Sequence, residues 1–340
     1  MATLPNPDRG NEGGVTYVVH QLANALVRHG QDITVFALDP RPADALYRHS
    51  FIDGPAWLGK YRPARLYVLA LYIARLDFSA FDVIHTNGED WLLGNHTPPR
   101  VRTYWGSARG EARAATTWRR AVNQAFIQYP LEFASAATAK QTVGISHMTV
   151  RHLPFIQNVI PPGVDLEHFH PRERKSEHPT ILYVADRLAG RKRGYTLLRT
   201  FRDHVLPARP DAELWLRCAE RIDGPSVRWI PRTQTIQELA ELFRQAWVFC
   251  LPSSYEGFGV PYVEALASGT AVVATHNGGA DEVLDRGRFG RLVHLRNLGQ
   301  SLIDLLADDG ERARLGQLGL ERAKEYSWDR VVERYVAVYR

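Results

Sequence analysis

Two glutamates, Glu256 and Glu264, stand eight positions apart in the segment SSYEGFGVPYVEA, directly after the apolar run at residues 247–252. Eight positions are about two turns of a helix, so a hydroxyl-rich ligand lying along that helix can meet both carboxylates. Gly257 and Gly259 leave backbone amides open at the helix start, where anions and hydroxyls bind. The alternative is a dipole-complementing cap residue followed by a surface charge. Because the two glycines, the proline and both carboxylates occur together in this segment, the ligand-binding interpretation is favoured over the cap residue and surface charge.

A basic turn, DRLAGRKRG, occupies residues 186–194 after the apolar run at 180–185. It carries four cations, namely Arg187, Arg191, Lys192 and Arg193. Each charge-assisted contact of such a side chain to a diphosphate contributes about 1.5–3 kcal/mol. The turn therefore either neutralises a diphosphate or is a solvated basic loop.

Two glycine pairs also precede predicted helices, Gly13-Gly14 at the start of the chain and Gly278-Gly279 after residues 270–275. Glycine lets a ligand approach the backbone, and free N–H groups at a helix start favour a phosphate. Ordinary flexible turns are the alternative, and each pair alone is a weak signal.

Short apolar runs alternate with helical periodicity along the whole chain, which predicts parallel sheets covered on both faces. The predicted strands are residues 32–38, 81–85, 101–105, 142–146, 158–160, 180–185, 212–218, 226–231, 247–252, 270–275 and 290–295. The predicted helices include residues 14–29, 63–76, 111–128, 236–245, 261–267 and 328–340. A proline-rich break at 161–171, followed by a charged stretch, separates two α/β halves with a cleft between them. Ligands of such sheets bind beyond the carboxyl ends of the strands.

Composition narrows the function classes. The chain has 340 residues, a length typical of about two domains. Its net charge of +5 is too small to indicate nucleic-acid binding by itself. Cys218 and Cys250 are the two cysteines, too few for a disulfide scaffold or a cysteine zinc site, and they suit a reducing cytoplasm. Residues 1–11 do not read as a secretory leader, and the longest apolar run, residues 66–73, is too short to span a bilayer.

The ordered motifs resemble the retaining glycosyltransferases of family four, the group 1 type with the two-domain GT-B fold. The matching segments are NEGGVTYVVHQLANALVRHG, FDVIHTN, VIPPGVDLEHFHP, DRLAGRKRG, LPSSYEGFGVPYVEALASGTAVVATHNGGADEVL and GRFGRLV. The resemblance implies two Rossmann-like domains facing across a cleft. We expect residues 1–165 on the acceptor side, residues 166–325 on the donor side, and a terminal helix at 326–340 returning to the first domain.

The resemblance also implies roles for single residues around a nucleotide-diphosphate-sugar donor. Arg187 and Lys192 match the basic pair that contacts the diphosphate, although counting back from Gly194 selects Arg193 instead of Lys192. Glu256 matches a catalytic position near the sugar, and Glu264 matches the carboxylate that binds the ribose. The remaining donor-binding positions are Gly13, Gly14, Arg232 (near the base), Gly257, Phe258, Gly259 and Val260.

The implied chemistry requires neither a metal nor another cofactor, because fixed cations stabilise the charge that grows on the leaving phosphate. No Asp-x-Asp or histidine cluster suggests a metal site. Family members retain the anomeric configuration through same-face attack. Where they often carry His-Gly, this chain has Trp105-Gly106, whose indole can stack on a sugar but lacks the imidazole's hydrogen bonds.

We expect the acceptor, a sugar, a lipid-linked molecule or a small molecule, in the first domain, near His85, Glu89, Asp90 and Trp105. Residues 60–75 and 109–120 mix basic and aromatic side chains, which suits either an anionic membrane surface or a packed helix with a solvated face. The enzyme is thus expected in the cytoplasm, with peripheral contact at the inner membrane face as one option and its oligomeric state open. A weakly catalytic nucleotide-sugar-binding protein and a GT-B 2-epimerase remain the alternatives.

Overall fold

A computed structural model describes residues 14–55, 57–60, 67–94, 98–115, 117–172, 174–232 and 235–340, with the backbone alone at 59 and 60. The chain divides into two compact units. The first unit comprises Met1–Gly163 and Trp328–Arg340, and the second comprises Val164–Ser327. The division thus falls after Gly163 and Ser327, beside the expected boundaries at 165 and 325.

The second unit is built on a parallel six-stranded sheet with the order β12-β11-β10-β7-β8-β9. Numbered within the unit, this is the order 3-2-1-4-5-6 of a doubly wound sheet, which reverses direction between β7 and β10. The predicted Rossmann-like α/β fold is therefore confirmed here. The strands are β7 Thr180–Val184, β8 Glu213–Arg217, β9 Val227–Ile230, β10 Val248–Leu251, β11 Ala271–Thr275 and β12 Arg291–Val293.

The central strands of this sheet are continuous apolar runs because helices cover both of their faces. Every residue of β7, β10 and β11 is buried. A capping box between Thr235 and Glu238 starts one covering helix, α11. The helices of this unit are α9 Gly194–Thr200, α10 Leu206–Ala208, α11 Ile236–Gln245, α12 Val260–Ala267, α13 Gly278–Val283, α14 Leu298–Ala307 and α15 Asp309–Ala323.

The first unit contains a parallel four-stranded sheet, β3-β4-β5-β6, and a separate parallel pair, β1-β2. Its strands are β1 Thr34–Ala37, β2 Arg48–Phe51, β3 Ile84–Thr86, β4 Arg100–Tyr104, β5 Gln141–Gly144 and β6 Asn158–Val159. Its helices are α1 Gly14–Arg28, α2 Trp57–Lys60, α4 Leu69–Ile73, α5 Ala108–Arg113, α6 Trp118–Asn123, α7 Tyr129–Ala137, α8 His147–His152 and α16 Trp328–Tyr339. A π-helical segment, Gln124–Gln128, joins α6 to α7.

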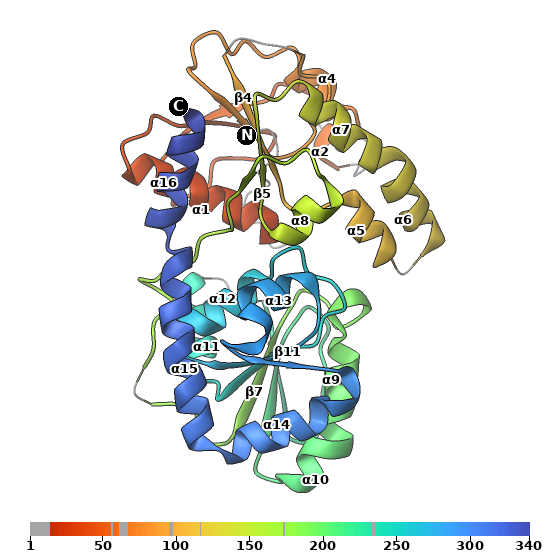
Figure 1. Cartoon of the computed structure of the whole chain (residues 1–340), viewed down its shortest axis with the longest axis vertical. Helices are drawn as coiled ribbons and strands as arrows, with labels where there is room; N and C mark the ends of the chain where they lie inside the picture. The colour runs from red at the N-terminus through yellow and green to blue at the C-terminus, as the bar shows by residue number, and fades with distance from the viewer. Residues whose placement is uncertain are drawn as a thin grey trace. The chain divides into compact units, whose positions relative to one another are not determined.

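The C-terminal helix α16 packs on the first unit (Figure 1). Its Val331, Val332 and Tyr335 share one buried cluster with Leu22 and Leu26 of α1. Periodicity in residues 328–340 already predicts an amphipathic helix, and the apolar side it buries is the one that faces α1 and the sheet. The last helix of the chain therefore completes the core of the unit in which the chain begins.

Candidate functional site

The basic turn and the glutamate segment follow neighbouring strands of the second unit. The basic turn follows β7, and the glutamate segment follows β10, with which β7 pairs through Val248 and Ile181. The strand order reverses between these two strands, which is where doubly wound sheets bind their ligands. Both predicted clusters thus leave the sheet at the position that the topology favours for a site.

Glu256 joins the two segments directly. Its side chain is almost fully buried, at 5% exposure. Lys192 Nζ lies 2.6 Å from its Oε1, and Arg191 Nη1 lies 3.1 Å from its Oε2. Burial by itself raises the pKa of Glu256, but Lys192 and Arg191 outweigh burial and hold the pKa below its usual value. Glu256 is therefore an ionised carboxylate that fixes two cations of the basic turn.

Arg191 was not assigned a role by the sequence, and the structure gives it one in holding the site together. Its Nη1 also donates to the carbonyl of Tyr255 at 2.8 Å, while its own carbonyl accepts from the amide of Ser254 at 2.8 Å. These bonds tie the turn after β7 to the loop after β10 along the backbone as well as through charge. A run of four cations in one turn was the signal that more than two of them are used.

Arg187 and Arg193 are placed differently from Lys192. Arg187 is exposed, and its guanidinium forms no hydrogen bond or ion pair within the described residues, while its carbonyl accepts from Tyr183 Oη at 3.0 Å. Arg193 has φ 53°, a left-handed conformation at the start of α9. Lys192, by contrast, points its ammonium at Glu256. The geometry therefore supports Lys192 as the second basic site residue and leaves Arg187 available to a ligand.

The glycines of the glutamate segment are required by the backbone. Gly259 has φ 96°, and a Cβ there would lie 2.4 Å from the ring of Tyr262. It immediately precedes α12, so the chain enters that helix with Gly257, Phe258 and Gly259 before it and Val260 as its first residue. The structure therefore places these four predicted donor-binding residues at one helix N-terminus, where amides and the dipole favour an anion.

The Gly278-Gly279 turn lies against the same loop. Gly279 donates its amide to the carbonyl of Glu256 at 3.1 Å. A Cβ on Gly279 would lie 2.2 Å from the carbonyl oxygen of Phe258 and 2.9 Å from Cβ of Glu256. The second glycine turn thus buttresses the Glu256 loop by close backbone packing.

We expect Gly279→Ala to destabilise the second unit by about 1–3 kcal/mol, the usual cost of overpacking a filled interior. Because the clash is with backbone, the loop of Glu256 must move. Urea denaturation followed by circular dichroism measures the free energy of unfolding. Gly14→Ala is the matched control, since a Cβ at Gly14 meets nothing within 4 Å. Equal stability of both variants would contradict the packing role of Gly279.

Glu264 lies inside α12 and is buried at 5% exposure, so it is not a surface charge. Burial raises its pKa to about 7, with Arg217 as the opposing influence. Arg217 ends β8, its Nη1 lies 3.8 Å from Asp186, and its buried Nε has no hydrogen-bond partner in the described chain. A buried carboxylate with a pKa near neutrality is strained when ionised, and a bound hydroxyl would relieve that strain.

The other predicted donor-binding residues are only partly described. Gly13 lies outside the described residues, while Gly14 opens α1 of the first unit and is exposed. Its lack of neighbours within 4 Å gives no packing reason for a glycine there. Arg232 follows β9 of the second unit and is half-buried.

His85 and Trp105, predicted near the acceptor, lie in the first unit within hydrogen-bonded packing. Both ring nitrogens of His85 are engaged, Nδ1 with Tyr339 Oη at 2.7 Å and Nε2 with Thr103 Oγ1 at 2.8 Å. Burial lowers the pKa of His85 to about 3, so its ring is neutral. Trp105 Nε1 donates to Asn87 Oδ1 at 2.9 Å. In this structure His85 joins the sheet to α16 through both ring nitrogens.

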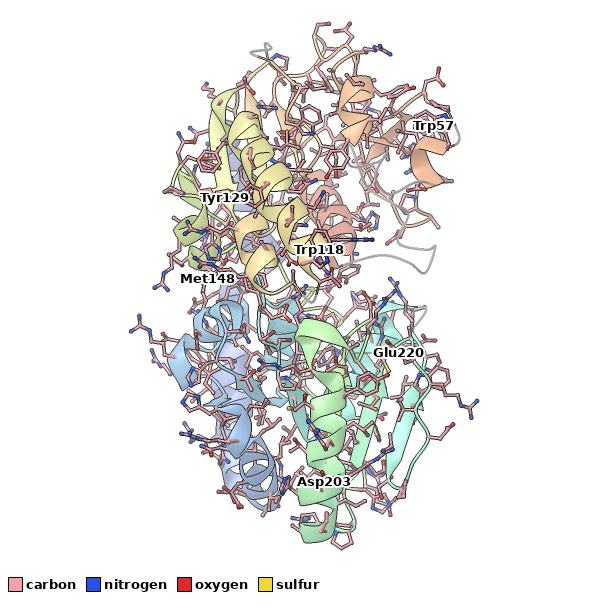
Figure 2. The ribbon with its side chains drawn as sticks, turned by 90° about the vertical axis from the view of Figure 1, so that its right-hand side faces the viewer. Trp57, Trp118, Tyr129, Met148, Asp203 and Glu220 are labelled. Atoms are coloured by element: carbon pink, nitrogen blue, oxygen red, sulfur yellow. The ribbon has the colours of Figure 1, made fainter. Side chains whose placement is uncertain are left out.

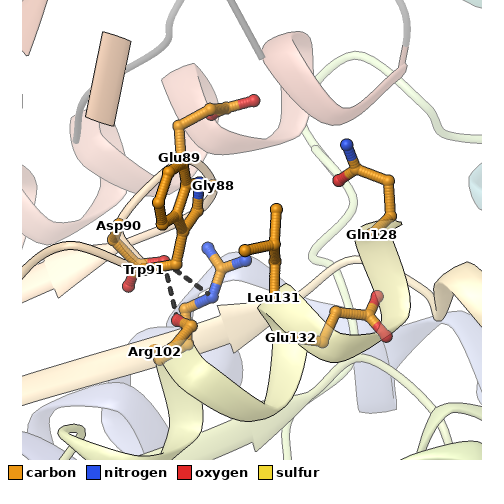
Figure 3. Close-up of a pocket in the computed structure, with 9 residues that line it drawn as sticks. Gly88, Glu89, Asp90, Trp91, Arg102, Gln128, Leu131 and Glu132 are labelled. Carbon is orange, nitrogen blue, oxygen red and sulfur yellow. Dashed lines mark hydrogen bonds and ion pairs between the residues drawn. The ribbon is translucent and has the colours of Figure 1, made fainter. Parts of the chain in front are cut away.

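Glu89 and Asp90 line a cavity of about 130 Å³ in the first unit (Figure 3). Asp90 is buried at 1% exposure, and its carboxylate is already occupied. It accepts from Ser135 Oγ at 2.7 Å and pairs with Arg100 Nη1 at 3.1 Å and Arg102 Nε at 3.4 Å. Asp90 therefore positions two arginines, whereas Glu89 lies at the cavity itself.

No helix within the described ranges is long and apolar enough to cross a membrane. Across the same residues, no three His, Cys, Asp or Glu side chains group in a way that could hold a metal ion.

Two family models match the chain, one in each half. Residues 12–168 match the model described as Glycosyltransferase Family 4, and residues 211–322 match Glycosyl transferases group 1. The MMP alpha-(1->4)-mannosyltransferase of Mycolicibacterium hassiacum is 35% identical over 54% of this chain and 47% of that protein, so the match spans about half the relative's length. The D-inositol 3-phosphate glycosyltransferase of Nocardioides sp. is 26% identical over 99% of this chain and 87% of that protein.

Solved structures match over both units. Sucrose-phosphate synthase from Thermosynechococcus elongatus has a TM-score of 0.76 at 22% identity, covering 99% of this chain and 97% of that one. HepE from Anabaena, solved in complex with UDP and glucose, has a TM-score of 0.70 at 15% identity, covering 99% and 98%. These likenesses show the GT-B fold that the motifs predict.

Proposed function

The chain belongs to the family 4, group 1 type glycosyltransferases, and on that premise we propose that it retains the anomeric configuration and works without a metal ion. It moves a sugar from a nucleoside-diphosphate donor to an acceptor hydroxyl in glycan, glycolipid or glycoconjugate synthesis. The observation that carries this proposal is the cluster of Glu256, Lys192 and Arg191 at the reversal point of the second unit's sheet, with Arg187 exposed in the same basic turn.

This cluster suits departure of a nucleoside diphosphate. When the sugar–phosphate bond breaks, negative charge grows on the phosphate oxygen, and cations that are already in position stabilise it without reorganisation. Lys192 is held by Glu256, and Arg187 is open to contact the diphosphate. The amides before α12 supply further donors. The leaving phosphate itself can take the acceptor proton, so retention needs no separate base.

Glu264 completes the part of the donor site that lies in the second unit, and Gly14 is the residue of the first unit to which the proposal gives a role. The carboxylate of Glu264, eight residues after Glu256, accepts hydroxyls of the ribose. Gly14 lets a phosphate approach the backbone at the start of α1. HepE was crystallised with UDP and glucose, which makes UDP-glucose a first donor to test on this chain.

The test is a panel of nucleotide sugars scored for thermal stabilisation and nucleoside-diphosphate release with an acceptor mixture of monosaccharides and D-inositol 3-phosphate. We expect release with at least one donor, retention of configuration by NMR of the product, and undiminished activity in excess EDTA. Loss of activity in EDTA that Mg²⁺ restores would refute metal independence. Stabilisation without any release would favour the nucleotide-sugar-binding alternative, and a 2-epimerised sugar product would favour the epimerase.

We also propose that the exposed face of α6 and α7 contacts an anionic membrane. Trp118 on α6 is 72% exposed, and Phe126, in the π-helical segment that joins α6 to α7, is 75% exposed. The guanidinium of Arg119 lies over the Trp118 ring at 5.6 Å, and the exposed Arg120 follows it on α6, where it pairs with Glu111. Figure 2 shows Trp118 at the surface of the first unit. Of the other basic aromatic stretch, residues 61–66 lie outside the described chain. Apolar side chains flanked by arginines suit the interface of an anionic bilayer.

Co-sedimentation with vesicles of anionic phospholipid tests this contact. We expect binding at low salt that weakens as salt rises, and at least a tenfold loss in Trp118→Ser/Phe126→Ser, since each large apolar side chain contributes about 1.5–3 kcal/mol when buried. Trp57→Ser is the control, because Trp57 is also exposed, at 44%, but lies on α2. Absence of low-salt binding, or equal loss in the control, would refute the contact.

A further inference from the structure

The cavity beside Glu89 is built from three separate segments of the first unit (Figure 3). The loop after β3 contributes Glu89, Asp90 and Trp91, strand β4 contributes Arg102, and the helical run ending in α7 contributes Gln128 and Glu132. Its volume is about 130 Å³. An apolar cavity near 150 Å³ holds benzene in another protein. A hydroxylated six-membered ring is larger than benzene, so a cavity of this size takes one edge of such a ring.

Four buried polar atoms on the lining residues have no hydrogen-bond partner in the described chain, namely Trp91 Nε1, Arg102 Nε, Arg102 Nη1 and Glu132 Oε2. Arg102 Nε has the ion pair with Asp90 at 3.4 Å, which leaves the other three to a ligand or water. Leaving such an atom unsatisfied costs about 1–3 kcal/mol, so native proteins rarely keep three of them in one place without a ligand or water. In Figure 3 the Arg102 guanidinium lies between the side chains of Trp91 and Leu131. The cavity thus presents two donors and one acceptor.

The remaining bonds of these side chains hold them in place. Glu132 Oε1 accepts from the amide of Ala108 at 2.8 Å, which fixes the carboxylate while Oε2 stays unpartnered. Arg102 pairs with Asp90 at 3.4 Å and lies over the ring of Tyr104 at 4.7 Å. The side chains are therefore set for a ligand before it arrives, which lowers the entropy cost of binding.

The charges that face the cavity do not suit an anion. Arg102 shares the carboxylate of Asp90 with Arg100, and Glu89 and Glu132 add two carboxylates with no further cation among the lining residues. Burial raises the pKa of Glu132 to about 7, which shows that ionised Glu132 finds little compensation. A phosphate would meet at least one carboxylate at close range. A hydroxyl, in contrast, accepts from one group and donates to another, and so satisfies donors and the acceptor together.

We propose that this cavity binds one neutral, hydroxylated ring of the acceptor. The ring's hydroxyls accept from Trp91 Nε1 and Arg102 Nη1 and donate to Glu132 Oε2. This inference rests on the proposed function, and it narrows the acceptor to molecules with an uncharged ring, free of phosphate, at this position.

The experiment measures direct binding without any donor, by saturation-transfer NMR of the whole chain with myo-inositol, methyl α-D-mannopyranoside and methyl α-D-glucopyranoside. We expect at least one of these to bind with a millimolar Kd, and glucose 1-phosphate to bind more weakly. Trp91→Phe removes one donor and Glu132→Gln removes the carboxylate acceptor while keeping an oxygen for Ala108. Each should weaken ring binding at least tenfold.

Glu111→Gln is the matched control, because Glu111 is a carboxylate on the neighbouring helix α5 that pairs with Arg120 at 2.8 Å. Its binding should equal that of the wild type. Failure of all three rings to bind, tighter binding of glucose 1-phosphate, or equal binding by Trp91→Phe and Glu132→Gln would overturn the proposal. Binding of UDP and other nucleoside diphosphates, measured separately, tests the donor site, so the two proposals can fail independently.

Discussion

Replacing Arg187 with alanine should lower kcat by a factor of about 10²–10³, the usual effect of removing one preorganised group that stabilises transition-state charge. Arg187 is exposed, and its guanidinium is not held by any described side chain, so the effect should fall on the reaction and not on folding. Nucleoside-diphosphate release under saturating donor measures kcat, and thermal unfolding confirms that the variant is folded.

Two further variants sharpen this result. Arg187→Lys keeps the charge but loses the planar fork, so its rate should lie between wild type and alanine. Arg199→Ala removes an exposed arginine from α9, a helix that follows the same turn, and should leave kcat unchanged. An unaltered rate in Arg187→Ala, or an equal loss in Arg199→Ala, would show that Arg187 does not act on the leaving group.

Glu264→Gln should have opposite effects on donor binding and stability. A carboxylate that accepts ribose hydroxyls contributes about 1.5–3 kcal/mol, so KM for the donor should rise roughly ten- to a hundredfold. The free protein, however, should become more stable at high pH, because the variant no longer has to ionise a buried carboxyl. Kinetics with varied donor and urea denaturation without donor separate the two effects.

The pH dependence follows from the raised pKa of Glu264. Its ordinary value is 4.5 and burial raises it to about 7, so the folded state holds the proton more tightly than the unfolded state between these values. The stability that this proton supplies is complete below pH 4.5 and is lost as pH rises through 7. As pH rises from 5 to 8, the free energy of unfolding of Glu264→Gln minus that of the wild type should increase by about 2–3 kcal/mol. A constant difference across this range would mean that Glu264 is already well solvated.

Much of the fold could be read from local pattern. Helix α11 occupies the predicted residues 236–245, and each predicted strand of the second half contains an observed one. Apolar runs in central parallel strands carry their own signal, because both faces are buried. Strand β2, with the sequence RHSF, was missed, since its side chains neither alternate nor form an apolar run and its pairing with β1 is a backbone interaction. The predicted helix at 111–128 is divided into α5, α6 and the π-helical segment.

The sequence by itself determined the family, the two-unit α/β organisation and the segments to which we assign the donor chemistry in our proposal, because these depend on residue types at fixed spacing within short stretches. Only the tertiary structure decided which charged side chains form ion pairs with one another. Arg191 and Glu256 are brought into contact across 65 positions of chain. Likewise Trp91, Arg102 and Glu132 come from three separate segments to line one cavity. Two arginines, Arg100 and Arg102, stand in the strand RVRTY and are both buried, but their partners depend on how the chain packs over long range.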